Sequence, residues 1–230
     1  MSFIISFSTI FYFTFLYVSI VFVRGGEQPE ASPWPKEEIS YEKYVQSVKI
    51  FNQAVQHQST DPKRAKELYL QSTVINPFLA EAYLNLGMLA ATTEEVKEMY
   101  LKAAHAASNG RNNQVYSDAM GNLGHHLVED SGLGHDYYIV EEALQYYREG
   151  LRVSPNHLSS LYNSGIAYEK QGKRQEAFDM YRRVMKEDSL HIGANLNAGN
   201  LCMYAGLHNL SLTFHSRALE GYTQRGNDPW

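Results

Sequence analysis

The chain has 230 residues and a formal net charge of -5 at pH 7. Mild acidity with scattered Lys and Arg excludes the clearly basic surface that a nucleic-acid-binding domain needs. The single cysteine, Cys202, excludes an internal disulfide framework and any metal site built from several cysteines.

The first 24 residues differ from the rest of the chain. Residues 3–23 carry no charge, and Arg24 ends the run. A helix needs roughly 20 residues to span a bilayer, whereas a secretory signal usually has a basic start and a shorter apolar core of about 7–15 residues. We expect residues 1–24 to be a single-pass membrane anchor. A cleaved signal peptide and a gene-model artefact stay open as alternatives.

The side of the membrane on which the remaining chain lies depends on this choice. Arg24 favours a cytosolic body for an uncleaved anchor, whereas cleavage of a signal would deliver the chain to the secretory lumen or outside the cell. Residues 25–40 follow as a linker. Their three prolines, two glycines and alternating charges disfavour a helix and cannot build a core.

One pattern recurs through the rest of the chain, where an Asn stands two residues before a Gly. It occurs at Asn85/Gly87, Asn122/Gly124, Asn163/Gly165 and Asn197/Gly199. Gly165 and Gly199 are 34 residues apart, as are Gly172 and Gly206. Large apolar residues recur at three- and four-residue steps around these positions, which indicates amphipathic helices. The period therefore predicts stacked helix–turn–helix units.

The clearest copy of the repeat runs through residues 158–190. Its marks are Leu161, Gly165, Tyr168, Gly172, Ala177, Tyr181 and Val184. In these residues and their spacing the chain resembles the tetratricopeptide repeat (TPR) family. The resemblance implies an all-α fold, a right-handed superhelix of antiparallel helix pairs (an α-solenoid), over residues 45–225, with a tail at 226–230. We expect five repeats, near 45–79, 80–113, 116–156, 158–191 and 192–225.

The glycines in this pattern have two predicted roles. Gly165 lies mid-helix, and with Ala177 it removes side-chain bulk so that the two helices of a pair approach closely, with Tyr168 and Tyr181 filling the space beside them. Tertiary packing then offsets the cost of about 1 kcal/mol that Gly carries in a helix relative to Ala. Gly172 and Gly206 are expected to end helices in the left-handed conformation.

Two departures from the family pattern stand out. Ala143 comes 19 residues after Gly124, whereas Ala177 comes 12 after Gly165. This predicts a longer turn near residues 129–138, either a tolerated insertion or a binding protrusion. TPR arrays also usually finish with an extra polar helix, and only "GYTQRGNDPW" follows the last predicted helix. We expect that helix to leave an apolar surface uncovered, formed by Leu210, Leu212, Phe214 and Leu219. Either the chain is a fragment of a longer protein, or a partner docks there, and self-association is one such use.

The four asparagines are the candidate peptide-binding residues. The resemblance implies that the first helices of successive pairs line a concave groove, into which the position two before the Gly points. An Asn amide both donates and accepts hydrogen bonds, so Asn85, Asn122, Asn163 and Asn197 could hold an extended peptide by its backbone. A similar ladder occurs in the TPR superhelix of protein O-glycosyltransferases. The alternative is that these asparagines only bond between neighbouring helices.

Residues beside the asparagines exclude one known type of TPR ligand. TPRs that dock chaperones clamp a C-terminal carboxylate with Lys and Arg at these flanking positions. Here the flanking residues are Leu84, Met88, Gly121, His125, Tyr162, Ile166, Leu196 and Asn200. None is Lys or Arg, so we expect a mixed apolar and polar groove that binds an extended or helical protein segment.

The sequence offers no catalytic motif. It has no phosphate loop, nucleophile elbow or metalloprotease motif, and the adjacent His125 and His126 lack a clear third ligand. We therefore expect no enzymatic activity, cofactor or metal. The leading hypothesis is a non-enzymatic protein–protein interaction scaffold at the membrane or in the secretory system. The alternatives are the TPR portion of a membrane O-glycosyltransferase-like protein and an oligomerising structural adaptor.

Overall fold

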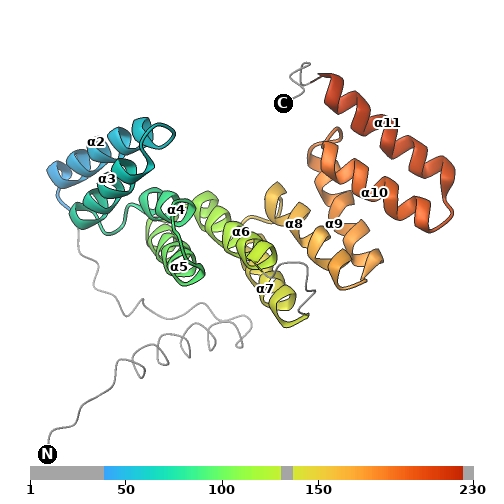
Figure 1. Ribbon diagram of the computed structural model, residues 1–230, viewed down its shortest axis with the longest axis horizontal. Coiled ribbons are helices and arrows are strands. Elements are labelled where there is room, and N and C mark those ends of the chain that lie inside the picture. The colour runs from blue at the N-terminus through green and yellow to red at the C-terminus, as the bar shows by residue number, and fades with distance from the viewer. Residues whose placement is uncertain (1–38, 131–136, 225–230) are drawn as a thin grey trace, which may run out of the picture. The chain divides into compact units, whose positions relative to one another are not determined.

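The computed structural model describes residues 39–130 and 137–224, and within them ten helices and no strand are present. The all-α prediction is confirmed. The helices form five consecutive pairs, and each helix packs against the next one in the chain (Figure 1). Their bounds are α2 (Tyr41–His57), α3 (Pro62–Ile75), α4 (Ala80–Met88), α5 (Thr93–Gly110), α6 (Asn113–Asp130), α7 (Tyr137–Val153), α8 (Leu158–Lys170), α9 (Arg174–Glu187), α10 (Ile192–Tyr204) and α11 (His208–Gln224).

Local signals set where these helices begin and end. The side chains of Ser40, Asp61 and Thr92 accept hydrogen bonds from backbone N–H groups in the first turns of α2, α3 and α5. Gly172 and Gly206 have φ angles of +74° and +76°, as the sequence predicts. After each of these glycines the chain closes a bond of 2.9 Å back to the helix, from Lys173 N–H to the Tyr168 carbonyl and its equivalent one repeat later.

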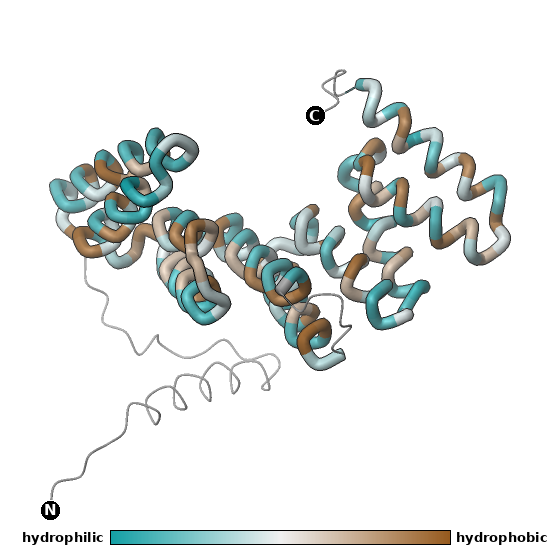
Figure 2. The backbone as a smooth tube through the Cα atoms, viewed as in Figure 1, coloured by the Kyte–Doolittle hydropathy of each residue, from teal (hydrophilic) through white to brown (hydrophobic). Residues whose placement is uncertain are grey.

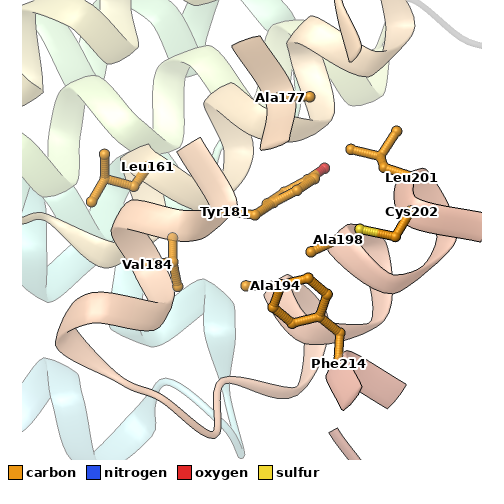
Figure 3. Close-up of a cluster of buried hydrophobic side chains, with 9 residues drawn as sticks. All are labelled: Leu161, Ala177, Tyr181, Val184, Ala194, Ala198, Leu201, Cys202 and Phe214. Carbon is orange, nitrogen blue, oxygen red and sulfur yellow. The ribbon is translucent and has the colours of Figure 1, made fainter. Parts of the chain in front are cut away.

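The core lies between helices and continues from one pair to the next. Each helix alternates between apolar and polar residues along its length (Figure 2), which fits one buried face. Between the fourth and fifth pairs the buried side chains come from α8, α9, α10 and α11 (Figure 3). They are Leu161, Ala177, Tyr181, Val184, Ala194, Ala198, Leu201, Cys202 and Phe214. No pair could bury this surface alone, so stacking stabilises the array.

In each of the last four pairs, a glycine on the first helix faces an aromatic ring on the second. A Cβ atom at Gly87 would lie 2.6 Å from a ring carbon of Tyr100, and one at Gly124 would lie 2.7 Å from Tyr147. Gly165 meets Tyr181 in the same way, and Gly199 meets His215. The prediction that side-chain bulk is excluded at Gly165 is therefore confirmed, with the ring of Tyr181 as the group that a Cβ would meet.

The structure corrects the expectation for the last helix at one residue. Phe214 is 7% exposed and contacts Phe178 of α9, with ring centroids 5.9 Å apart. Leu210, Leu212 and Leu219 are 41%, 68% and 65% exposed. The three leucines are uncovered in the described residues, whereas the phenylalanine belongs to the core.

The predicted insertion is partly helical. Asp130 ends α6 six residues after Gly124, and Tyr137 begins α7 six residues before Ala143. In the next pair, α8 ends five residues after Gly165 and α9 begins three residues before Ala177. Residues 131–136 lie outside the described residues. Some of the extra length therefore extends the helix pair instead of forming a turn.

The N-terminal segment expected to enter the membrane, residues 3–23, also lies outside the described residues. Within residues 39–130 and 137–224 no helix has the length and apolar character needed to cross a bilayer.

Replacing Gly165 with Ala should lower the free energy of unfolding by about 1–3 kcal/mol, because the new methyl group overlaps the ring of Tyr181. Gly110 in α5 is the matched control, since a Cβ there meets nothing within 4 Å. Gly110→Ala should leave stability unchanged or raise it by about 0.4–1 kcal/mol. Urea denaturation followed by circular dichroism measures both. Equal effects of the two substitutions would contradict the packing role of Gly165.

Candidate peptide-binding surface

The four predicted asparagines lie at equivalent positions on the first helices of four pairs. Asn85, Asn122, Asn163 and Asn197 belong to α4, α6, α8 and α10, and each side chain is partly exposed. First helices of successive pairs also touch directly, since α4 contacts α6 and α6 contacts α8. The asparagines are therefore placed in one series along neighbouring helices.

Three of these asparagines bind a tyrosine of the preceding pair. The Nδ2 of Asn85 donates to the hydroxyl of Tyr69 at 3.1 Å, and that of Asn197 donates to the hydroxyl of Tyr181 at 3.2 Å. Asn122 forms the same kind of bond with Tyr100. Bonding between neighbouring helices, the alternative given by the sequence, is thus present at these three positions.

Asn163 differs from the other three. Within the described residues its side chain has no hydrogen bond to Tyr147, the tyrosine that occupies the equivalent place on α7. Burial, together with the nearby Glu129 carboxylate, raises the pKa of Tyr147 well above its ordinary value. Asn163 therefore keeps both its amide donor and its carbonyl acceptor for another molecule.

The tyrosine hydroxyls fix which way the bonded amides point. Tyr69 donates its own proton to Oε1 of Gln58 at 2.6 Å, so it must accept from Asn85. Tyr181 is likewise hydrogen-bonded to the Glu169 carboxylate. One amide N–H of Asn85 and one of Asn197 are therefore engaged inside the protein, whereas their carbonyl oxygens remain as acceptors.

Burial keeps these tyrosines uncharged. Loss of solvent raises the pKa of Tyr69, Tyr100 and Tyr181 above the ordinary value. Burial also raises the pKa of Glu169, although the bond from Tyr181 opposes this shift. One carboxylate oxygen of Glu169 has no hydrogen-bond partner among the described residues. The asparagine bonds are thus between neutral groups in a partly dry environment, whereas Glu169 is a half-buried acid whose charged form is disfavoured by burial.

Apolar side chains flank the asparagines on the same helices. Met88 and Leu196 are 57% and 42% exposed. Tyr162 is held by ring contacts to Tyr181 and His191, with centroids 5.9 and 5.1 Å apart. The surface combines carbonyl acceptors with apolar and aromatic side chains, and it suits a peptide that offers backbone N–H groups and apolar side chains.

Comparisons with known proteins agree on the repeat. Residues 158–189 match the Tetratricopeptide repeat family model. Two solved structures are similar in fold, each at 12% identity. The MamA RS-1 ArsTM double mutant has a TM-score of 0.62, and the match covers 83% of this chain and 100% of that chain. MamA 41-end from Desulfovibrio magneticus RS-1 has a TM-score of 0.58, and the match covers 83% of this chain and 99% of that chain. The chain folds as a tetratricopeptide-repeat solenoid.

One curated relative also shares sequence with this TPR chain. Protein O-mannosyl-transferase TMTC2 of Mus musculus is 31% identical over 118 residues, which are 50% of this chain and 14% of that protein. The chain spans only a small part of that relative's length.

The sequence reasoning missed a fifth asparagine. Asn52 in α2 stands two residues before Ala54, and Ala54 is fully buried in the same cluster as Tyr69. Ala54 thus takes the place that Gly has in the other TPRs, and Asn52 is exposed. A search for Asn two residues before any small residue, instead of before Gly alone, would have found it.

A second link between TPRs was also missed. His157, at the start of α8, is 2.8 Å from Asp118 of α6 through Nε2 and 2.8 Å from Ser160 through Nδ1. His157 and Ser160 are both buried, so this group of polar residues joins two first helices and offers no reactive hydroxyl at the surface.

Neither a metal site nor a deep pocket accompanies the asparagines. In the described part of the chain, no group of three or more His, Cys, Asp or Glu residues could hold a metal ion. An open cavity of about 390 Å³ lies away from the asparagines, between the end of α9 and the end of α11. The asparagines lie on four first helices, so the candidate surface is suited to binding along several helices.

Replacing Asn197 with Ala should lower the free energy of unfolding by about 1 kcal/mol relative to Asn163→Ala, because only Asn197 bonds to a tyrosine. Both substitutions exchange a mid-helix Asn for Ala, so the change in helix propensity is the same. Urea denaturation of the two variants measures the difference. If both lose equal stability, the Asn197–Tyr181 bond does not contribute.

Proposed function

We propose that this TPR solenoid is a non-enzymatic scaffold that binds an extended or helical segment of a partner protein along the first helices of its pairs. The observation that supports this is the series of spare amide groups. Asn85, Asn122 and Asn197 present carbonyl acceptors, and Asn163 presents both an acceptor and a donor. No Lys or Arg flanks these residues to clamp a terminal carboxylate. The ligand is therefore an internal segment held by its backbone N–H groups.

Backbone recognition gives a specific prediction. A library of extended 12-residue peptides, screened by fluorescence anisotropy, should contain ligands that the chain binds without a strict sequence motif. Methylating the backbone nitrogens of such a ligand removes its donors and should weaken binding by about tenfold or more, since each lost bond to a spare acceptor is worth about 1 kcal/mol.

The matched protein variants are Asn163→Ala and Asn109→Ala. Asn163→Ala removes the amide that is free in the described residues, so it should weaken binding several-fold without loss of stability. Asn109 lies on α5, a second helix, where its side chain bonds to His105 at 3.2 Å, so Asn109→Ala is a control outside the proposed surface and should leave binding unchanged. Unchanged binding by Asn163→Ala, with the helix content intact, would contradict the proposal.

A second candidate function is supported by the relative in Mus musculus. The similarity to Protein O-mannosyl-transferase TMTC2 favours a TPR portion that presents acceptor segments to a sugar transferase. The same peptide screen separates the two functions, because acceptor delivery requires that the captured peptides be rich in Ser and Thr hydroxyls, whereas a general scaffold captures peptides irrespective of them.

Residues 1–24 are included in this proposal as the anchor or signal that brings the scaffold to the membrane or secretory system. The uncharged run of residues 3–23 supports this. Protease protection of the repeat body in sealed microsomes, with N-terminal sequencing of the product, distinguishes an anchor from a cleaved signal.

Self-association through α11 is the third part of the proposal. Leu212 and Leu219 follow Phe178 and Met185 by one 34-residue period. In α9 those two side chains pack against the core shared with the next pair, whereas in α11 the leucines are exposed. The same face that receives a neighbouring pair inside the chain is therefore open to a second copy.

Sedimentation equilibrium should show a mass that rises with concentration for the native chain. Leu212→Glu with Leu219→Glu should abolish this rise, because two charges cannot be buried unpaired in the interface. Leu70→Glu in α3, an exposed leucine far from α11 in sequence, should leave the rise unchanged. A constant monomer mass for the native chain would rule out this interface.

A further inference from the structure

A second surface, separate from the asparagines, lies where the paired helices turn. Tyr137 and Tyr138 begin α7, Tyr168 lies near the end of α8, Lys173 and Arg174 lead into α9, and Tyr204 ends α10. We refer to these six residues as the turn patch. It shares no residue with the candidate peptide-binding surface, and the proposed function makes no use of it.

Direct contacts connect the turn patch across three successive pairs. The ammonium nitrogen of Lys173 lies 5.8 Å from the ring centroid of Tyr137 and 5.9 Å from that of Tyr168. The guanidinium carbon of Arg174 lies 5.9 Å from the ring of Tyr204. Tyr138 meets Tyr137 edge-on at 6.1 Å. Two adjacent cations thus lie among four aromatic rings in one continuous strip.

The aromatic rings of the strip are open to solvent. Tyr138 and Tyr204 are 83% and 79% exposed, and Tyr137 is 53% exposed. Large exposed aromatic residues are typical of binding surfaces, because they supply contact area at low entropic cost. Three such rings beside two cations are more than an ordinary solvated helix end requires.

The two cations have no carboxylate partner among the described residues. The nearby acid, Glu141, is bonded to Arg148 at 2.8 Å and to Gln171 at 3.2 Å, although Lys173 still contributes to the lowered pKa of its carboxyl. Glu169 is half-buried and bonded to Tyr181. Lys173 and Arg174 therefore carry positive charges that no salt bridge neutralises among the described residues, in a chain with a net charge of -5.

We propose that the turn patch binds an acidic peptide segment of a partner protein. Its carboxylates would accept hydrogen bonds from Lys173 and Arg174, and Arg can hold a carboxylate with two N–H groups at once. Apolar or aromatic side chains of the same segment would pack on Tyr138 and Tyr204. The overall negative charge disfavours nucleic acid, and the cations are fewer than the four to eight that typify binding to anionic lipid.

The test uses the full chain and a fluorescein-labelled peptide of six Glu-Tyr repeats. Anisotropy should show binding that weakens as salt is raised, since the attraction lies at the surface. Lys173→Glu with Arg174→Glu should weaken binding by about tenfold or more. Tyr204→Ala removes a ring without changing the charge and should weaken it several-fold.

The matched control changes the same amount of charge elsewhere. Lys49→Glu with Lys63→Glu, on α2 and α3, should alter the affinity by less than about twofold, since both residues are exposed and remote in sequence from the patch. Circular dichroism verifies that every variant keeps its helix content. The proposal is overturned if the control weakens binding as much as the patch variant, or if a Lys-Tyr peptide binds equally well. It is also overturned if phosphatidylserine vesicles or single-stranded DNA bind at this site while the acidic peptide does not.

Discussion

A tyrosine held between two helix pairs is the contact on which the stack depends. The ring of Tyr100 or Tyr181 lies against a glycine of its own pair, and its hydroxyl accepts from an asparagine of the next. The first contact closes a pair and the second attaches the following pair, so one side chain serves both levels of the fold. At these two pairs the glycine leaves room for the ring, because a Cβ would lie within 3 Å of it. Glycine, tyrosine and asparagine therefore form one structural unit spread over two repeats.

The unit changes along the chain, and the changes explain where functional groups become available. In the fourth pair Asn163 has no tyrosine bond among the residues that the structure describes, so its amide is available. In the fifth pair His215 replaces the tyrosine over Gly199 and bonds to Asn200 on its own pair. In the first pair Ala54 replaces the glycine. In each case a small residue on the first helix still packs in the core with a ring on the second helix. What differs between the pairs is the hydrogen-bond partner of the asparagine or of the ring.

The sequence was sufficient for the helices and for the equivalence of the asparagines, because both follow from a period that repeats in the chain itself. It was not sufficient for the partners of those asparagines. Tyr69 and Tyr181 precede their asparagines by 16 residues, but Tyr100 precedes Asn122 by 22, so no fixed spacing marks the bond. Nor could spacing show that Phe214 turns into the core while Leu212 and Leu219 stay outside. Which of these side chains is buried depends on which side of α11 packs against α9 and α10.

The use of the asparagine donors inside the protein limits what the proposed surface can bind. A ligand carbonyl that competed for the tyrosine-bonded N–H of Asn85 or Asn197 would have to replace a bond that joins two pairs, and would gain little net free energy by the exchange. A ligand N–H meets no such competition, because the amide oxygens of these two residues accept no bond among the described residues. At Asn163 a peptide can both donate and accept without displacing a bond to a tyrosine. An extended segment held in this way would leave the contacts between the pairs in place.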